Sequence, residues 1–160
     1  MVNENALLEE RAGAALLKKS LTVACAESCT GGLLTSRLTD VAGSSAYVLG
    51  SVVSYSNEVK MSHLGVKAET LQRFGAVSEE TAQEMSGGVR GRIGADIGIG
   101  ITGIAGPGGG TVEKPVGLVY ISVAGDKGAV VTRNVFSGTR REIKQQTVDK
   151  ALNMLLDYIS

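Results

Sequence analysis

Ser28 stands in a turn between two apolar segments, where its hydroxyl could act as a nucleophile. Residues 21–26 are small and uncharged, which predicts a strand covered on both faces. Three leucines within residues 33–38 recur at helical spacing and predict a helix. Free N–H groups at such a strand-to-helix turn suit the oxyanion of an acyl-transfer reaction. The spacing alone favours a simpler alternative, that Ser28 or Thr30 only caps the helix.

Lys60 is a second residue whose position suggests chemistry. Asn57 is expected to cap a short helix over residues 58–64, so Lys60 falls in the first turn. The positive end of the helix dipole disfavours a cation there, and partial burial would also lower the pKa of the ammonium. A neutral lysine can take a proton from a serine hydroxyl. Sequence alone favours the alternative of a solvated lysine on a surface helix.

Two arginines, Arg140 and Arg141, stand in the first turn of the last predicted helix, residues 139–159, which opens with a capping-box pattern. Cations oppose the dipole at this end unless an anion lies there. With the preceding Gly138, Arg140 therefore suits a clamp for phosphate or carboxylate. A pair with Glu142, or plain exposure to solvent, is about equally compatible with the sequence.

A glycine-rich loop at residues 103–115 follows an apolar strand predicted at residues 97–102. Open α/β sheets bind ligands beyond the carboxyl ends of their strands, which favours a ligand-binding loop over a flexible tip. Thr102, at the end of that strand, can offer a hydroxyl to the same crevice. The string from Gly98 to Gly103 resembles a dinucleotide fingerprint, but its first glycines lie inside the strand, so we reject that interpretation.

The remaining elements predict an α/β fold with a single domain over residues 1–160. Residues 3–19 form an amphipathic pattern with Leu7 inward and Glu9 outward. Further strands are predicted at residues 47–55, 116–124 and 129–136, the last two as a hairpin, and further helical segments at residues 68–74 and 79–89.

Composition narrows the choice of partners. Sixteen basic and sixteen acidic residues cancel, so no net field favours nucleic acid or a membrane surface, and a small molecule is the expected partner. Cys25, Cys29 and the single histidine, His63, do not form a recognisable zinc pattern. Unpaired thiols, and the lack of a signal-peptide pattern, indicate the cytoplasm. No apolar run reaches the ~20 residues of a membrane span.

Six sequence blocks together resemble the CinA C-terminal domain family, the nicotinamide-nucleotide amidohydrolases of PncC type. The resemblance spans about residues 5–158. Its blocks are Ala26-Glu-Ser-Cys-Thr-Gly-Gly32, Val53-Ser-Tyr-Ser-Asn-Glu-Val-Lys60, Gly75-Ala-Val-Ser78, Thr102-Gly-Ile-Ala-Gly-Pro-Gly-Gly109, Lys114-Pro-Val-Gly117 and Phe136-Ser-Gly-Thr-Arg140.

The resemblance implies a three-layer α/β/α sandwich with a mixed central sheet, a homodimer, and no cofactor or metal. It also implies hydrolysis of the carboxamide of nicotinamide mononucleotide to nicotinate mononucleotide and ammonia. By position, Ser28 matches the nucleophile, Lys60 the base and Tyr55 a further catalytic residue. Substrate binding is expected at Thr30, Gly31, Thr102, Gly103, Gly106 and Arg140.

Two other functions stay open at this point. The same residues would serve a serine hydrolase of another small amide or ester, and Ser28 and Lys60 would also suit a non-catalytic nucleotide-binding module. Longer relatives carry an N-terminal domain that resembles molybdopterin-binding proteins, and no activity of that domain is expected for residues 1–160.

Overall fold

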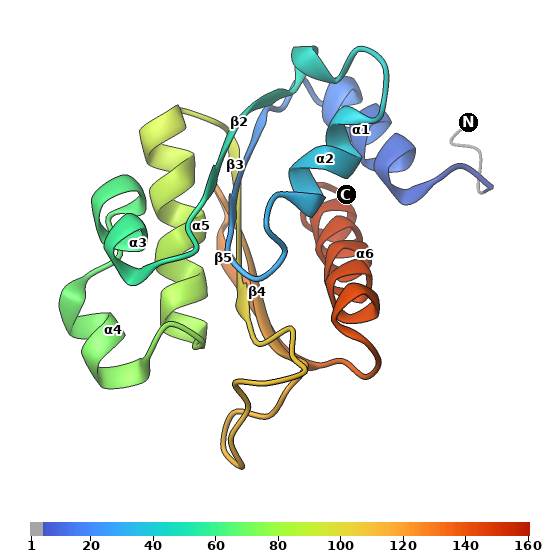
Figure 1. The fold of residues 1–160 in the computed structure, drawn as a ribbon. Coiled ribbons are helices and arrows are strands. Elements are labelled where there is room, and N and C mark those ends of the chain that lie inside the picture. The colour runs from blue at the N-terminus through green and yellow to red at the C-terminus, as the bar shows by residue number, and fades with distance from the viewer. Residues whose placement is uncertain (1–4) are drawn as a thin grey trace.

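A computed structural model describes residues 5–160 as one mixed sheet between two layers of helices (Figure 1). The strands lie in the order β2-β1-β3-β4-β5, with β1 parallel to β2 and β3, and β4 antiparallel to β3 and β5. They are β1 (Val23–Glu27), β2 (Val48–Val53), β3 (Ile97–Gly103), β4 (Leu118–Gly125) and β5 (Gly128–Val135). The three-layer α/β/α sandwich with a mixed sheet is therefore confirmed.

The helices divide between the two faces of the sheet (Figure 1). One face is covered by α1 (Leu8–Lys18), α2 (Leu33–Thr39) and α6 (Arg140–Ile159), and the other by α3 (Asn57–Leu64), α4 (Ala68–Phe74) and α5 (Glu79–Ile93). A short 3-10 helix, Ser44–Ala46, precedes β2. No helix among residues 5–160 combines the length and apolar character needed to cross a bilayer.

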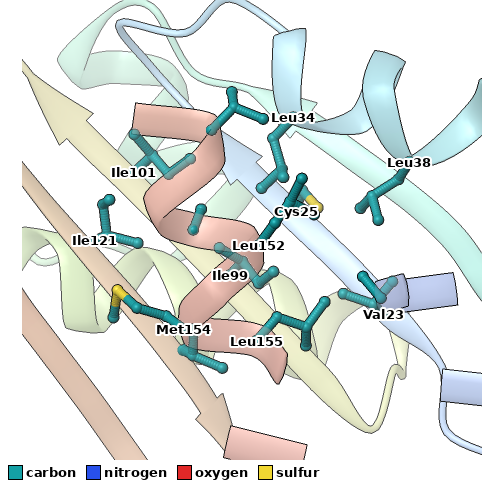
Figure 2. Packing of buried hydrophobic residues seen from close by; sticks show 14 of the residues in the cluster. Val23, Cys25, Leu34, Leu38, Ile99, Ile101, Ile121, Leu152, Met154 and Leu155 are labelled. Carbon is teal, nitrogen blue, oxygen red and sulfur yellow. The ribbon is translucent and has the colours of Figure 1, made fainter. Parts of the chain in front are cut away.

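Alternation along the strands separates two apolar clusters. Val23 and Cys25 of β1 point toward α2 and α6, where they join the larger cluster shown in Figure 2. Ala24 and Ala26, on the opposite face of the same strand, pack toward α3 and α5. The second face carries the smaller side chains because α5 lies very close to the sheet there.

Two glycines of β3 permit this close approach. A Cβ on Gly98 would lie 2.1 Å from the Ser86 carbonyl oxygen, and one on Gly100 would lie 2.5 Å from that of Ala82. Both glycines lie inside the strand, as expected, so their function is packing rather than a phosphate-binding turn.

The prediction for the first helix was partly wrong. Helix α1 begins at Leu8, and the predicted residues 3 and 4 lie outside the described part of the chain. Leu7 is 61% exposed instead of buried. Glu9 is buried instead of solvated, because its carboxylate accepts a hydrogen bond from Arg37 at 2.6 Å. Arg37 also pairs with Asp149, so this ion-pair network joins α1, α2 and α6.

The predicted cap of α3 was wrong by one residue. Ser56, rather than Asn57, is the N-cap, and its hydroxyl accepts a hydrogen bond from the Val59 amide at 3.2 Å. Lys60 nevertheless lies in the first turns of the helix, as expected. The capping box of α6 is confirmed between Thr139 and Glu142, and the β4–β5 hairpin is confirmed by its continuous antiparallel register.

Candidate active site

The predicted site residues converge at the carboxyl ends of the strands that share one direction. Ser28 follows β1, Tyr55 follows β2, and the glycine-rich loop follows β3. Arg140 arrives at the same edge because β5 runs parallel to β3, by way of the antiparallel β4. A pocket of about 260 Å³ lies between them, lined by Ser28, Cys29, Tyr55, Gly103, Ile104, Ala105, Gly106, Gly108, Gly109 and Arg140.

A larger cavity, of about 450 Å³, lies at the opposite edge of the sheet, near the starts of β1 and β3. Among residues 5–160, no serine, threonine, cysteine or histidine lines it. Its lining residues are Lys19, Leu21, Arg90, Asp96, Ile97, Asp126, Lys127, Tyr158 and Ile159. Chemistry rather than volume therefore identifies the pocket at Ser28 as the candidate active site.

The amine of Lys60 meets the hydroxyl of Ser28. Lys60 Nζ lies 3.1 Å from Ser28 Oγ and donates to the Ser54 carbonyl oxygen at 2.7 Å. The parallel register of β1 and β2 ends with Glu27 opposite Val53, which places the residues that follow, Ser28 and Ser54, side by side. The Ser54 amide donates to the Glu27 carbonyl at 2.7 Å and fixes this junction. Helix α3 then returns Lys60 to the turn.

The environment of Lys60 destabilises its charged form. The residue is only 2% exposed, and among residues 5–160 it forms no ion pair with a carboxylate. Burial lowers the pKa of the Lys60 ammonium, and the nearby Cys29 thiol opposes this shift only in part. A buried amine with a lone pair beside a serine hydroxyl has the properties of a general base.

The turn that carries Ser28 requires glycine. Gly31 and Gly32 have φ values of 61° and 102°, in the left-handed region that other residues rarely adopt. The Gly31 amide donates to the Ser28 carbonyl at 3.0 Å, which removes it from the candidate oxyanion donors. Within residues 5–160 the amides of Cys29 and Thr30 donate to no other residue. These two N–H groups can therefore donate hydrogen bonds to a ligand oxygen.

Glu27 is a site residue that sequence reasoning missed. Its side chain is fully buried beneath the turn. One carboxylate oxygen accepts from the Thr30 hydroxyl at 2.7 Å and from the Leu34 amide at 3.0 Å. The other accepts from the amide and hydroxyl of Thr35 at 3.0 and 2.6 Å. Glu27 therefore fixes the start of α2 against β1. An acid that ends an apolar strand was the signal in the sequence.

Arg140 connects three parts of the pocket. Its guanidinium donates to the Tyr55 hydroxyl at 2.8 Å and to the Gly106 carbonyl at 2.7 Å. The alternative pair with Glu142 is not formed, because that carboxylate instead accepts from the Thr139 amide at 3.3 Å. Tyr55 is 64% exposed, so its ring borders the open side of the pocket.

Three of the predicted binding residues do not line the pocket. The Thr30 hydroxyl is buried and bonded to Glu27. The Thr102 hydroxyl is also buried and donates to the Ala76 carbonyl at 2.7 Å. Gly31 lies in the turn after Ser28 and is exposed, but it is not among the residues that line the pocket. Gly103 and Gly106, by contrast, form part of the pocket wall with Arg140.

Both cysteines are unpaired and buried. Cys29 borders the pocket, and burial raises the pKa of its thiol to about 11, so the thiol is neutral at physiological pH. In the described part of the chain, no three His, Cys, Asp or Glu side chains are grouped to hold a metal ion. Ser28 is therefore a better candidate nucleophile than its cysteine neighbour.

An α/β/α sandwich with a serine–lysine pair at the carboxyl edge of its sheet defines a class of protein suited to acyl transfer. Comparison with known proteins gives the family. The chain belongs to the CinA C-terminal domain family, whose pattern matches residues 5–159.

Solved structures and curated relatives support the same family assignment. The crystal structure of the competence/damage inducible protein CihA from Agrobacterium tumefaciens is 43% identical, with a TM-score of 0.93 over 96% of this chain and 94% of that one. CinA-like proteins of Endomicrobium trichonymphae and Chlorobium limicola are 52% and 51% identical over 152 and 157 residues, each covering 95% of this chain. The chain spans about 37% of the length of the curated relatives it matches.

Proposed function

We propose that this chain is a nicotinamide mononucleotide deamidase that acts through a serine–lysine acyl-enzyme mechanism. The observation that carries the proposal is the 3.1 Å contact between Lys60 Nζ and Ser28 Oγ, made by a buried amine that has no acidic partner within the described residues. Membership of the CinA C-terminal domain family supports it, since the resemblance noted above is to nicotinamide-nucleotide amidohydrolases.

In the first half-reaction, neutral Lys60 takes the proton of the Ser28 hydroxyl as the oxygen attacks the carboxamide carbon. The N–H groups of Cys29 and Thr30 hold the resulting oxyanion. The C–N bond then breaks, and the proton on Lys60 passes to the departing amine, with Tyr55 as the relay. Ammonia leaves and a nicotinoyl ester remains on Ser28.

In the second half-reaction, water replaces ammonia as the partner of Lys60. The amine takes a proton from water, and the hydroxide adds to the ester carbonyl. The ester bond breaks, Lys60 returns the proton to the Ser28 oxygen, and nicotinate mononucleotide is released. Arg140 and the first part of the glycine-rich loop, residues 103–109, hold the ribose and phosphate during both steps.

Ammonia release from nicotinamide mononucleotide tests the proposal directly. Removal of a nucleophile or general base typically costs at least 10²–10⁴-fold in rate, so we expect such losses in Ser28→Ala and Lys60→Met. Lys67→Met, at the exposed N-cap lysine of α4, is the matched control and should keep wild-type activity. A Ser28→Ala protein with the wild-type rate would refute the nucleophile.

The two alternatives predict different results in the same assay. Equal turnover of nicotinamide riboside and its phosphorylated form would favour a hydrolase of other small amides. Binding of the mononucleotide without ammonia release, and without a covalent adduct on Ser28 in mass spectra, would favour a non-catalytic binding module.

We also expect a homodimer and a cytoplasmic location. Light scattering coupled to gel filtration tests the first expectation, and cell fractionation tests the second.

A further inference from the structure

Lys144 lies on α6 beside the candidate active site, and no step of the proposed reaction uses it. A Cβ added to Gly31 would lie 3.7 Å from Lys144 Nζ, so the ammonium group lies against the turn that carries Ser28. The same ammonium partly opposes the rise that burial causes in the pKa of Cys29. Lys60 reaches this turn from α3 and Lys144 reaches it from α6, on opposite faces of the sheet (Figure 1).

No carboxylate in the described part of the chain neutralises the charge of Lys144. Within residues 5–160 its side chain forms no hydrogen bond and no ion pair, although it is half-buried. The carboxylates of this region are engaged elsewhere. Glu27 accepts four hydrogen bonds, Asp149 pairs with Arg37, and Glu142 completes the capping box of α6.

Lys144 also stands one helical turn after Arg140. Side chains four residues apart are neighbours on a helix, and like charges at this spacing repel. Among residues 5–160, Arg140 donates to a carbonyl and a hydroxyl and has no acidic partner either. Arg140 lines the pocket, and Lys144 lies one helical turn further along α6, against the turn that carries Ser28. Two cations so placed, without an acidic partner in the part of the chain that the structure describes, are favourable when an anion binds beside them.

We propose that Lys144 is a substrate-binding residue that holds, together with Arg140, the phosphate monoester of a mononucleotide at the rim of the Ser28 pocket. The identity of this ligand rests on the proposed function. The carboxamide must meet Ser28 on the side of Lys60, which leaves the opposite end of the substrate on the side of α6. The pair of cations then selects phosphorylated substrates over their nucleosides.

Steady-state kinetics of Lys144→Met tests this role. A hydrogen bond to a charged group is worth about 1.5–3 kcal/mol, so KM for nicotinamide mononucleotide should rise roughly 10–150-fold with little change in kcat. Turnover of nicotinamide riboside should not change, and Lys144→Arg should keep most of the affinity. Lys150→Met, at an exposed lysine of the same helix, should behave as wild type. An unchanged KM, or an equal loss with both substrates, would overturn the proposal.

Calorimetric titration with nicotinate mononucleotide separates this inference from the deamidase proposal. If the ligand binds the wild type and not Lys144→Met while no ammonia is released, the phosphate site stands and the deamidase proposal fails. If ammonia is released and Lys144→Met keeps its affinity, the phosphate site fails and the deamidase proposal stands. If the wild type neither binds this ligand nor releases ammonia, both fail.

Discussion

Replacing Glu27 with glutamine should destabilise the turn that carries Ser28. The two carboxylate oxygens each accept one backbone N–H, from Leu34 and from Thr35, and one threonine hydroxyl. A glutamine side chain keeps one of these oxygens and replaces the other with an NH₂ group. A hydroxyl can rotate to accept from the new donor, but a backbone N–H cannot. One backbone amide, either the buried N–H of Leu34 or the partly buried N–H of Thr35, therefore loses its acceptor in either orientation of the glutamine.

The expected cost follows from these contacts. A buried donor without a partner costs about 1–3 kcal/mol, and the three remaining hydrogen bonds lose their charged acceptor. Glutamine avoids the desolvation of a buried carboxylate, which offsets part of that loss. We expect a net loss of about 2–4 kcal/mol in the free energy of unfolding. For a chain of this size, that lowers Tm by roughly 5–15 °C.

Urea unfolding of Glu27→Gln measures this cost. Glu113→Gln, at an exposed acid of the glycine-rich loop, makes the same change of charge without a buried carboxylate and should lie within about 0.5 kcal/mol of the wild type. If the two variants have the same free energy of unfolding, Glu27 is not the acceptor that fixes α2, and our account of the turn is wrong.

Three further predictions concern packing and titration. Gly88→Ala should lower the free energy of unfolding in urea by at least about 1–3 kcal/mol, because its Cβ would lie 1.8 Å from the Leu64 carbonyl oxygen. A Cβ on the neighbouring Gly87 meets nothing within 4 Å, so Gly87→Ala should instead stabilise the protein by about 0.5–1 kcal/mol. Because burial raises the pKa of Cys29 to about 11, native protein at pH 8 should be alkylated by iodoacetamide at least about 100-fold more slowly than unfolded protein, and fast labelling would contradict this burial. Because burial lowers the pKa of Lys60, the neutral base forms at a lower pH than in an exposed lysine. We therefore expect kcat/KM to rise with pH and to level off below the ordinary lysine pKa near ~10.4. A profile that falls over this range would exclude Lys60 as the base.

Local patterns predicted the strand before Ser28, the turn and the capping box of α6, because these are properties of neighbouring residues, although the cap of α3 was wrong by one residue. The capping box of α6 is one example, and the apolar run of β1 is another. The contact between Ser28 and Lys60 depends on the pairing of β1 with β2, which is a long-range property. Only the resemblance to a family supplied that contact before the structure did.

Hydroxyl groups show what sequence patterns leave undetermined. Thr30 and Thr102 are close in sequence to the pocket-lining residues Ser28 and Gly103, yet both hydroxyls donate to acceptors inside the fold. Periodicity predicts which face of an element is buried, but not which acceptor a buried hydroxyl finds there. Glu9 was assigned to solvent for the same reason, since its partner Arg37 lies on another helix.

The direction of the strands explains why one edge of the sheet collects the chemistry. Strands β1, β2 and β3 are parallel, and β4 reverses so that β5 runs in their direction again. Four strands therefore end at the same edge and deliver, in turn, Ser28, the start of α3 with Lys60, the glycine-rich loop, and α6 with Arg140. Each group arrives on a separate element that is packed into the core, so the pocket is assembled by the sheet and not by one flexible loop. Substitutions that shift α5 against Gly98 and Gly100 would consequently move β3 and its loop relative to Ser28.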